Sequence, residues 1–227
     1  MDSTNSFPKV LSKIDMKVRR MSDQIAEAKW FYDAGNMNEA YERALKLEET
    51  SEKTVLLTRA LPVYTGNPSA MQEVERTIAL NIPVDIGFTV ENWFSIRFPL
   101  LLPKKPAGSA DYIRSILYPA MQCFFQHKEP VRYDDCVLIF RHVYDRNRPE
   151  REKRDHDNIE VNMVSDIVAL YTMPDDNPQV CSHFYCSASG MQERTEVYVV
   201  PKNDFPTWLV MERIMPDEGV KLYEKHL

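Results

Sequence analysis

The sequence predicts an α+β protein in which an α-helical hairpin precedes a domain built on a mixed sheet with flanking helices. Two helical stretches come first, over residues 10–34 and 38–61, with a short break between them. Strand-like and helical stretches then follow in the order strand, helix, strand, helix, strand, strand. Because a short turn joins the last two strands, we expect them to form a hairpin in a mixed sheet, not a doubly wound one. We expect the helical hairpin over residues 1–65 and the sheet domain over residues 80–215.

The first helical stretch carries a heptad pattern, with charged residues on its other faces. The apolar residues at alternating steps of three and four are Leu11, Ile14, Val18, Met21, Ile25, Ala28 and Tyr32. Gly35 and Asn36 end this helix, and Asn38 can cap the second one. We expect a dimerising or docking hairpin. A faint similarity of residues 30–47 to one tetratricopeptide-type helix pair is an alternative, although no second copy follows.

The sheet domain begins after a boundary rich in proline and glycine. Residues 62–68 supply these turn residues, and apolar side chains then alternate from Val84 to Val90, as in a strand. The later elements expected are a helix from Ser109 to Phe125, a strand over 135–144, a helix over 157–171, strands over 180–188 and 195–200, and a short helix over 205–211.

Composition excludes several classes of protein. No stretch approaches the roughly 18 apolar residues of a membrane helix, and the N-terminus lacks a basic segment followed by an apolar one. The spacing of the four cysteines does not indicate a disulfide framework, so we expect reduced thiols and a cytoplasmic protein. The net charge of −6 argues against nucleic-acid binding unless basic residues are concentrated in one place.

One short stretch does concentrate basic residues. Its five members are Arg146, Arg148, Arg151, Lys153 and Arg154, with Glu150 and Glu152 between them. Such a run is either a solvated loop or a surface that contacts phosphates without reading the base sequence.

Four aspartates flank the helix expected over residues 157–171. Asp155 and Asp157 lie at its start, and Asp175 and Asp176 follow its end. Carboxylate oxygens are the ligands that Mg²⁺ prefers. A straight helix of this length would separate its ends by about 20–25 Å, so the acids meet only through a short or bent helix, a returning loop or a second subunit. The alternative is local structure, namely an N-terminal cap at Asp157 and a turn at Asp175.

The order of these motifs resembles the RusA family of Holliday-junction resolvases. A basic run leads into Asp155-His-Asp157-Asn158, a helix carries Asp166-Ile-Val-Ala-Leu170 towards its end, and Asp175-Asp176 precedes a strand. The spacing from Asp157 to Asp176 also matches that family. The resemblance covers about half of the chain and excludes residues 1 to about 80. It implies a RusA-like α+β sheet domain.

The resemblance also implies an activity. RusA-type enzymes are homodimeric endodeoxyribonucleases that bind four-way DNA junctions and nick two strands symmetrically, and they are common in phage-like mobile elements. By that resemblance Asp155, Asp157 and Asp176 would be catalytic and would bind Mg²⁺ or Mn²⁺, with Asp175 as a further metal ligand. The basic run from Arg146 to Arg154 would bind DNA phosphates beside the metal.

The chain departs from that family at one position. The family has a lysine four residues after the second motif aspartate, where this chain has Val161, or Asn162 if the alignment is shifted by one residue. Neither side chain can stabilise a developing negative charge as a cation does. The alternative is therefore a catalytically weakened RusA-fold module that binds DNA or a protein. An adaptor without a nucleic-acid role is a further possibility, which the acidic composition favours.

A zinc site is a weaker alternative. Cys181 and His183 would share one face of a strand, but Cys186 would point to the other. A closed zinc site needs four ligands, and only Cys136 or His142, distant in sequence, could complete it.

Overall fold

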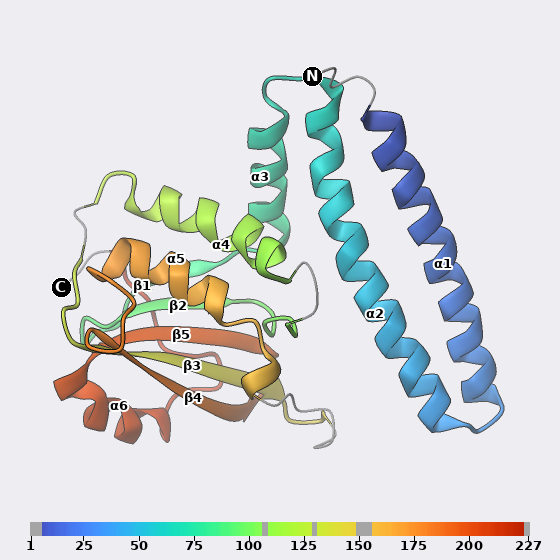
Figure 1. Ribbon diagram of the computed structural model, residues 1–227. Coiled ribbons are helices and arrows are strands. Elements are labelled where there is room, and N and C mark those ends of the chain that lie inside the picture. The colour runs from blue at the N-terminus through green and yellow to red at the C-terminus, as the bar shows by residue number, and fades with distance from the viewer. Residues whose placement is uncertain (1–5, 106–108, 129–130, 149–155, 225–227) are drawn as a thin grey trace. The chain divides into compact units, whose positions relative to one another are not determined.

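The computed structural model confirms the α+β class and describes residues 6–105, 109–128, 131–148 and 156–224 (Figure 1). The chain divides into two compact units, residues 1–77 and 78–227, which are described separately.

The first unit is a helical hairpin. α1 (Phe7–Asp33) and α2 (Met37–Ala60) lie side by side, and the 3-10 helix η2 (Leu61–Thr65) follows. The turn between the two helices has a positive φ of 75° at Gly35, a conformation that glycine adopts without strain. Asn36, and not Asn38, caps α2, because its side chain accepts a hydrogen bond from the backbone N–H of Glu39.

The contact between α1 and α2 is narrow and partly polar. Gln24, the one fully buried residue of α1, donates a 3.2 Å hydrogen bond from Nε2 to the Lys46 carbonyl oxygen. Thr54 on α2 is also buried, and its hydroxyl lies 3.7 Å from the Met21 sulfur and donates to the Thr50 oxygen. Since α2 covers only part of the predicted heptad pattern, the rest of that pattern stays on the surface.

The second unit contains a five-stranded sheet, and α3 (Ala70–Asn81) leads into it from the first unit. The strands are β1 (Asp85–Phe88), β2 (Phe94–Phe98), β3 (Cys136–Asp145), β4 (Cys181–Gly190) and β5 (Arg194–Pro201). Their order in the sheet is β1-β2-β5-β3-β4. Only β3 and β4 run parallel; every other neighbouring pair of strands is antiparallel.

The predicted hairpin of the last two strands is wrong. β5 pairs with β2 and β3, so β3 lies between β4 and β5. Nearly every residue of β3 is buried, as expected for a central strand of a sheet that has helices on both faces. β4, by contrast, alternates between exposed and half-buried side chains, as an edge strand does. The expected strand through Val90 is also wrong, because a turn with φ 66° at Asn92 separates β1 from β2.

Helices cover the two faces of the sheet unequally. α4 (Ser109–Phe125) and α5 (Asn162–Thr172) lie against one face, and α6 (Phe205–Glu212) lies against the other (Figure 1). Buried residues on the α4–α5 face include Phe94, Ile96, Phe98, Leu138, Phe140, Val197 and Val199. The α6 face is centred on Trp93, Val137, Ile139, Tyr198, Val200 and Trp208.

The C-terminal segment pairs with the β1 edge of the sheet. Phe88 and Tyr223 exchange two backbone hydrogen bonds of 2.8 Å. Gly87 allows this approach, because a Cβ there would lie 2.6 Å from the Tyr223 carbonyl oxygen. The β4 edge lies at the other side of the sheet, and the candidate site is beside it.

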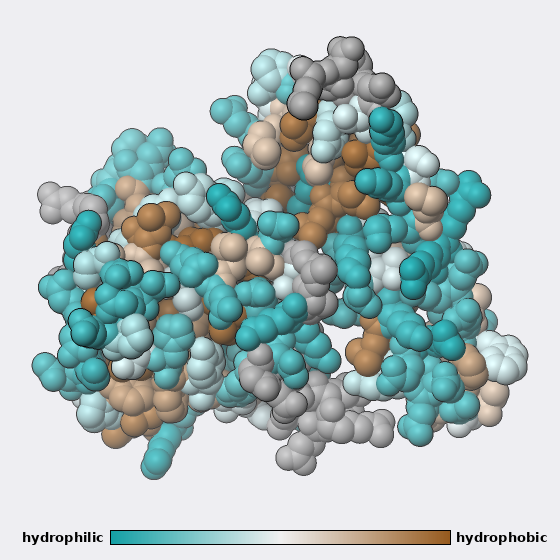
Figure 2. Space-filling view, viewed as in Figure 1, coloured by the Kyte–Doolittle hydropathy of each residue, from teal (hydrophilic) through white to brown (hydrophobic). Residues whose placement is uncertain are grey.

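None of the helices in the described ranges combines the length and apolarity needed to cross a membrane. On the face shown in Figure 2, hydrophobic residues gather over α6 at the lower left, where Leu209 and Val210 are exposed.

Candidate functional site

The helix expected over residues 157–171 begins later than predicted, which changes the position of the acidic motif. A single 3-10 turn, η4 (His156–Asn158), comes first, and α5 starts only at Asn162. Between them Ile159 is buried and forms an antiparallel bridge with Lys104. Backbone hydrogen bonds on both sides of the bridge, such as the one that Glu160 donates to the Pro103 oxygen (2.9 Å), hold this segment extended. Tertiary pairing therefore replaces the first turn of the predicted helix.

Glu160 takes the capping role that the sequence assigned to Asp157. Its Oε1 accepts a hydrogen bond of 3.3 Å from the backbone N–H of Met163, in the first turn of α5. Its Oε2 accepts a 3.2 Å hydrogen bond from the Ser109 hydroxyl, which connects the starts of α4 and α5. Asp157 lies four residues before the N-cap of α5, Val161, and is not needed to begin the helix.

The four predicted metal ligands are described to different extents. Asp155 lies outside the described residues, and only the backbone of Asp157 is described, within η4. Asp175 and Asp176 are described in full, in the turn between α5 and β4. Among side chains in the described ranges, no group of three or more His, Cys, Asp or Glu residues is placed to hold a metal ion.

The turn after α5 brings Asp176 back towards the helix. α5 has 11 residues, or about 16 Å, which is shorter than the sequence suggested. The pKa of Asp166 on α5 is raised, first by partial burial and then by the negative charges of Asp176 and Glu160. Asp176 thus lies within electrostatic range of a carboxylate ten residues before it. Both groups are carboxylates, the type of donor that a hard divalent cation prefers.

Asp175 has a structural role within this turn. Its carboxylate accepts hydrogen bonds from the Asp176 backbone N–H (2.8 Å) and from the Asn177 side-chain amide (2.7 Å). These hydrogen bonds, that from Asn177 first, lower the pKa of Asp175. The Asn177 side chain in turn accepts a hydrogen bond from the backbone N–H of Gln179. The turn that sequence alone offered as an alternative is therefore present at Asp175.

His156 attaches the other end of the acidic motif to the sheet. Its Nε2 lies 2.9 Å from the Ser187 hydroxyl oxygen on β4. Its ring also packs edge-to-face on Tyr185 and His142, with centroids 6.0 and 5.8 Å away. His142 Nδ1 in turn lies 3.2 Å from the Thr195 hydroxyl. These contacts place His156, which lies between Asp155 and Asp157 in the sequence, beside β4.

A row of polar side chains on β4 connects the two ends of the motif. We call His183, Tyr185 and Ser187 the β4 row, since alternate residues of a strand share a face. His183 Nδ1 lies 3.1 Å from the Tyr185 hydroxyl, and Tyr185 stacks on Phe140 with centroids 5.5 Å apart. The pKa of His183 is raised, first by a hydrogen bond with Cys181 and also by the charge of Asp176. One end of the β4 row, His183, is thus influenced by the charge of Asp176, and the other end, Ser187, contacts His156.

The sequence alone assigned no role to Asp166, Tyr185 or Ser187, and it offered His183 only as a possible zinc ligand. The signal for the row was present as a period-two alternation of polar residues on an edge strand. That signal could be interpreted only once β4 was known to lie at the edge.

The structure describes both residues that align with the lysine of the resembling family, Val161 and Asn162. Val161 is buried at the start of α5, so its side chain is not available to a phosphate. Asn162, the other aligned residue, is exposed.

The two described members of the basic run form ion pairs within the chain. Arg146 pairs with Asp217 at 2.7 Å, and both side chains are about half exposed. Arg148 pairs with Glu193 and lies over the Tyr144 ring. Arg151, Lys153 and Arg154 lie outside the described residues. The Arg146–Asp217 pair is exposed, and exposed ion pairs contribute little free energy, whereas the side chains of Arg148 and Glu193 are only 24% and 35% exposed.

The cysteines are free thiols, and their arrangement does not complete a zinc site among the described residues. Cys136 and Cys181 face each other in register on β3 and β4. Their shared hydrogen bond raises the pKa of Cys136 and lowers that of Cys181. Cys186 points to the opposite face of β4 and packs with the α6 cluster.

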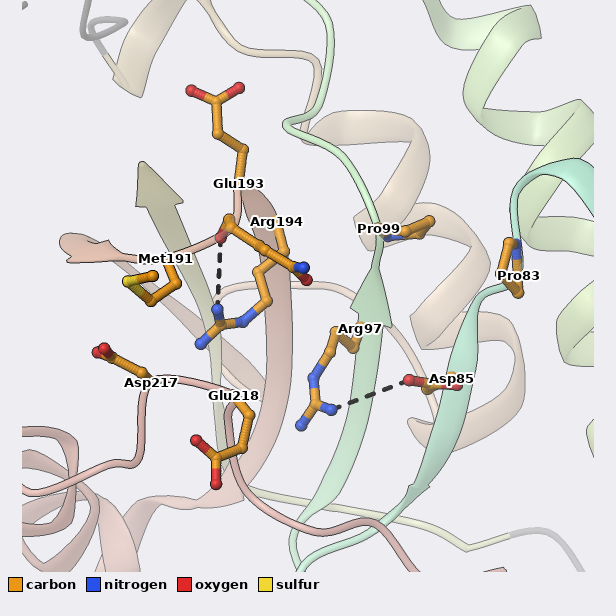
Figure 3. Close-up of a pocket in the computed structure, with 10 residues that line it drawn as sticks. Pro83, Asp85, Arg97, Pro99, Met191, Glu193, Arg194, Asp217 and Glu218 are labelled. Carbon is orange, nitrogen blue, oxygen red and sulfur yellow. Dashed lines mark hydrogen bonds and ion pairs between the residues drawn. The ribbon is translucent and has the colours of Figure 1, made fainter. Parts of the chain in front are cut away.

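A hollow of about 460 Å³ lies where β2 ends and β5 begins (Figure 3). Arg97 and Arg194 lie on its wall, and Arg97 is 3.9 Å from Asp85. Beneath it, buried Glu196 forms ion pairs with Arg194 (2.6 Å) and Arg141 (3.0 Å). Burial alone would raise the pKa of Glu196, but the two guanidinium groups hold it below its usual value. Arg141 also pairs with Glu212 at 3.1 Å, so the four charges balance, and removal of one partner would leave a buried charge uncompensated.

Comparison with known proteins adds a family without an assigned role. A family model described as "Family of unknown function (DUF6100)" matches residues 2–226. Neither the curated proteins nor the solved structures include a match to the chain.

Proposed function

The chain belongs to the DUF6100 family, and we propose from its own residues that it is a metal-dependent, structure-selective DNA endonuclease resembling the RusA resolvases. The observation that carries this proposal is the arrangement along β4. The turn after α5 returns Asp176 to the neighbourhood of Asp166, and His156 fixes the preceding motif to Ser187. The contact of His156 with β4 and the charge of Asp176 on His183 of the same strand support this arrangement.

In this proposal Asp155, Asp157 and Asp176 hold Mg²⁺ or Mn²⁺, with Asp175 beside them. Such an ion would activate water and stabilise charge on the scissile phosphate. The contacts of His156 with Ser187 and Tyr185 position the motif backbone.

The basic run would bind the DNA backbone. Arg146 and Arg148 would exchange their carboxylate partners for phosphates, and Arg151, Lys153 and Arg154 extend the run towards Asp155. The substrate would be branched DNA such as a four-way junction. A homodimer suits it, because two symmetric nicks require two related sites. The free thiols are compatible with a reducing cytoplasm.

One observation favours a second candidate, a RusA-fold module that binds DNA or protein without efficient cleavage. Val161 is buried where the resembling family places a lysine, so a cation near the scissile phosphate would have to come from elsewhere in the chain.

The test is cleavage of a labelled synthetic four-way junction, with a linear duplex of matched sequence, in Mg²⁺, in Mn²⁺ and in EDTA. Symmetric nicks on the junction alone, dependent on the metal, are the expected result. Junction binding without nicks in either metal would support the second candidate. The absence of both binding and cleavage would overturn the endonuclease and the DNA-binding form of the second candidate.

A further inference from the structure

Half of the heptad pattern on α1 is exposed. Leu11, Val18, Ile25 and Tyr32 are spaced by seven residues, and their exposed fractions are 47, 52, 54 and 63%. The other members of the pattern, such as Met21, face α2 and are half-buried. Apolar residues repeated every seven positions form a continuous stripe along a helix, which is typical of a surface that packs on another helix.

The hairpin also buries few apolar side chains. Gln24 is the one fully buried residue of α1, and those of α2 are Ala40, Thr50 and Thr54. An isolated pair of helices depends on apolar burial for stability, because helix propensity alone is marginal in water. Covering the exposed stripe would therefore add the apolar burial that the hairpin lacks.

The charges beside the stripe are arranged symmetrically. Asp15 and Lys29 lie seven residues before and after Ser22, and all three are exposed. If two copies of α1 run antiparallel about a two-fold axis at Ser22, each Asp15 lies beside the partner subunit's Lys29. The same axis places Val18 opposite the partner subunit's Ala26, one residue from the partner subunit's Ile25. A parallel pair would instead place like charges opposite each other, which is unfavourable.

We propose that α1 pairs antiparallel with α1 of a second copy, so that two hairpins form a four-helix bundle centred on Ser22. This interface is independent of the proposed nuclease reaction and lies in the other unit of the chain. Asp15 already pairs with Arg19 on its own helix at 3.0 Å, but that pair is exposed and contributes little. Asp15 can therefore also bind the partner subunit's Lys29.

The first experiment measures the mass of the full chain in solution by sedimentation over a range of concentrations. A dimer is expected. The double variant V18E/I25E should raise the dimer dissociation constant at least about tenfold, because it places four carboxylates in the paired stripe. Met16→Glu is the matched control, since Met16 is equally apolar and exposed but lies on another face of α1. A monomeric wild-type chain, or a dimer insensitive to V18E/I25E, would overturn the proposal.

The second experiment tests the antiparallel register. Asp15→Lys alone and Lys29→Asp alone should each weaken the dimer, and the double exchange should restore it. Ser22→Cys should give a disulfide-linked dimer on mild oxidation, in a Cys123→Ser background that removes the exposed native thiol. Failure of both the rescue and the cross-link in a dimeric protein would overturn the antiparallel arrangement.

Discussion

The Nε2 atom of His156 lies 2.9 Å from the hydroxyl oxygen of Ser187, which connects a motif residue to a strand 31 positions later. This contact attaches η4 to β4.

Replacing Ser187 by Ala removes the hydroxyl that meets His156. We expect junction cleavage to fall by ~3- to 10-fold, as for the loss of one hydrogen bond of ~1 kcal/mol. The melting temperature should change little, because Ser187 is exposed. Ser189→Ala, one repeat further along the exposed face of β4, is the control. Equal effects of the two variants would contradict a specific role for Ser187.

Asp157→Asn and Asp176→Asn should each abolish metal-dependent cleavage, with a loss of more than ~100-fold. An amide keeps the size of the side chain but removes the charge that binds a divalent cation. Circular dichroism should show an unchanged fold. Asp134→Asn, an exposed aspartate just before β3, should cleave like the wild-type protein. Full activity in either site variant would eliminate that residue as a metal ligand.

Asp166→Asn should make the protein slightly more stable at neutral pH, by less than ~1 kcal/mol because the group is largely exposed. Its folded pKa is raised, so the folded state is penalised when the carboxyl is ionised, above that pKa. As the pH falls through the folded pKa to below the unfolded value, the penalty disappears. The difference between variant and wild type in urea unfolding should therefore vanish in acid. A difference that grows towards low pH would contradict this assignment.

Glu196→Gln should destabilise the protein by ~3–5 kcal/mol, because it leaves the buried guanidinium groups of Arg141 and Arg194 without their shared carboxylate. Urea unfolding measures this. Asp135→Asn breaks the exposed pair with Lys202 and should cost ~0–1 kcal/mol. A similar loss of unfolding free energy in the two variants would show that the Glu196 network does not behave as a buried ion cluster.

Asp217→Asn should strengthen junction binding by ~2- to 5-fold at low salt, because it releases Arg146 for a phosphate. Fluorescence anisotropy in EDTA measures binding without cleavage. The gain should disappear at high salt and in the double variant R146Q/D217N. A gain that persists in the double variant would exclude Arg146 as its source.

Much of the fold could be predicted from local pattern, because period and turn residues are local properties. The helical hairpin, the strand beginning at Cys136 and the helix beginning at Ser109 were all recognised in this way. The neighbours of each strand could not be predicted. The short turn from β4 to β5 suggested a hairpin, but β5 pairs instead with β2 and β3.

The candidate site was predictable only in part. Asp155, Asp157, Asp175 and Asp176 are visible as motifs, and their roles as metal ligands stay predictions. The late start of α5 could not be foreseen, because it depends on pairing between Ile159 and Lys104, 55 positions apart in the chain. His183, Tyr185 and Ser187 acquire meaning only from the place of β4 at the edge of the sheet.

The position of β5 has a consequence for the order in which the sheet domain can assemble. β5 is the last strand of the chain, yet it alone connects the β1–β2 hairpin to the β3–β4 pair. During synthesis these two pairs remain separate pieces until residues 194–201 emerge, so the sheet cannot close while most of the domain is already made. Pairing over long sequence separations forms slowly, and the unpaired sides of β2 and β3 stay open to other chains in the meantime. The nascent protein is therefore most prone to aggregation just before its final strand appears.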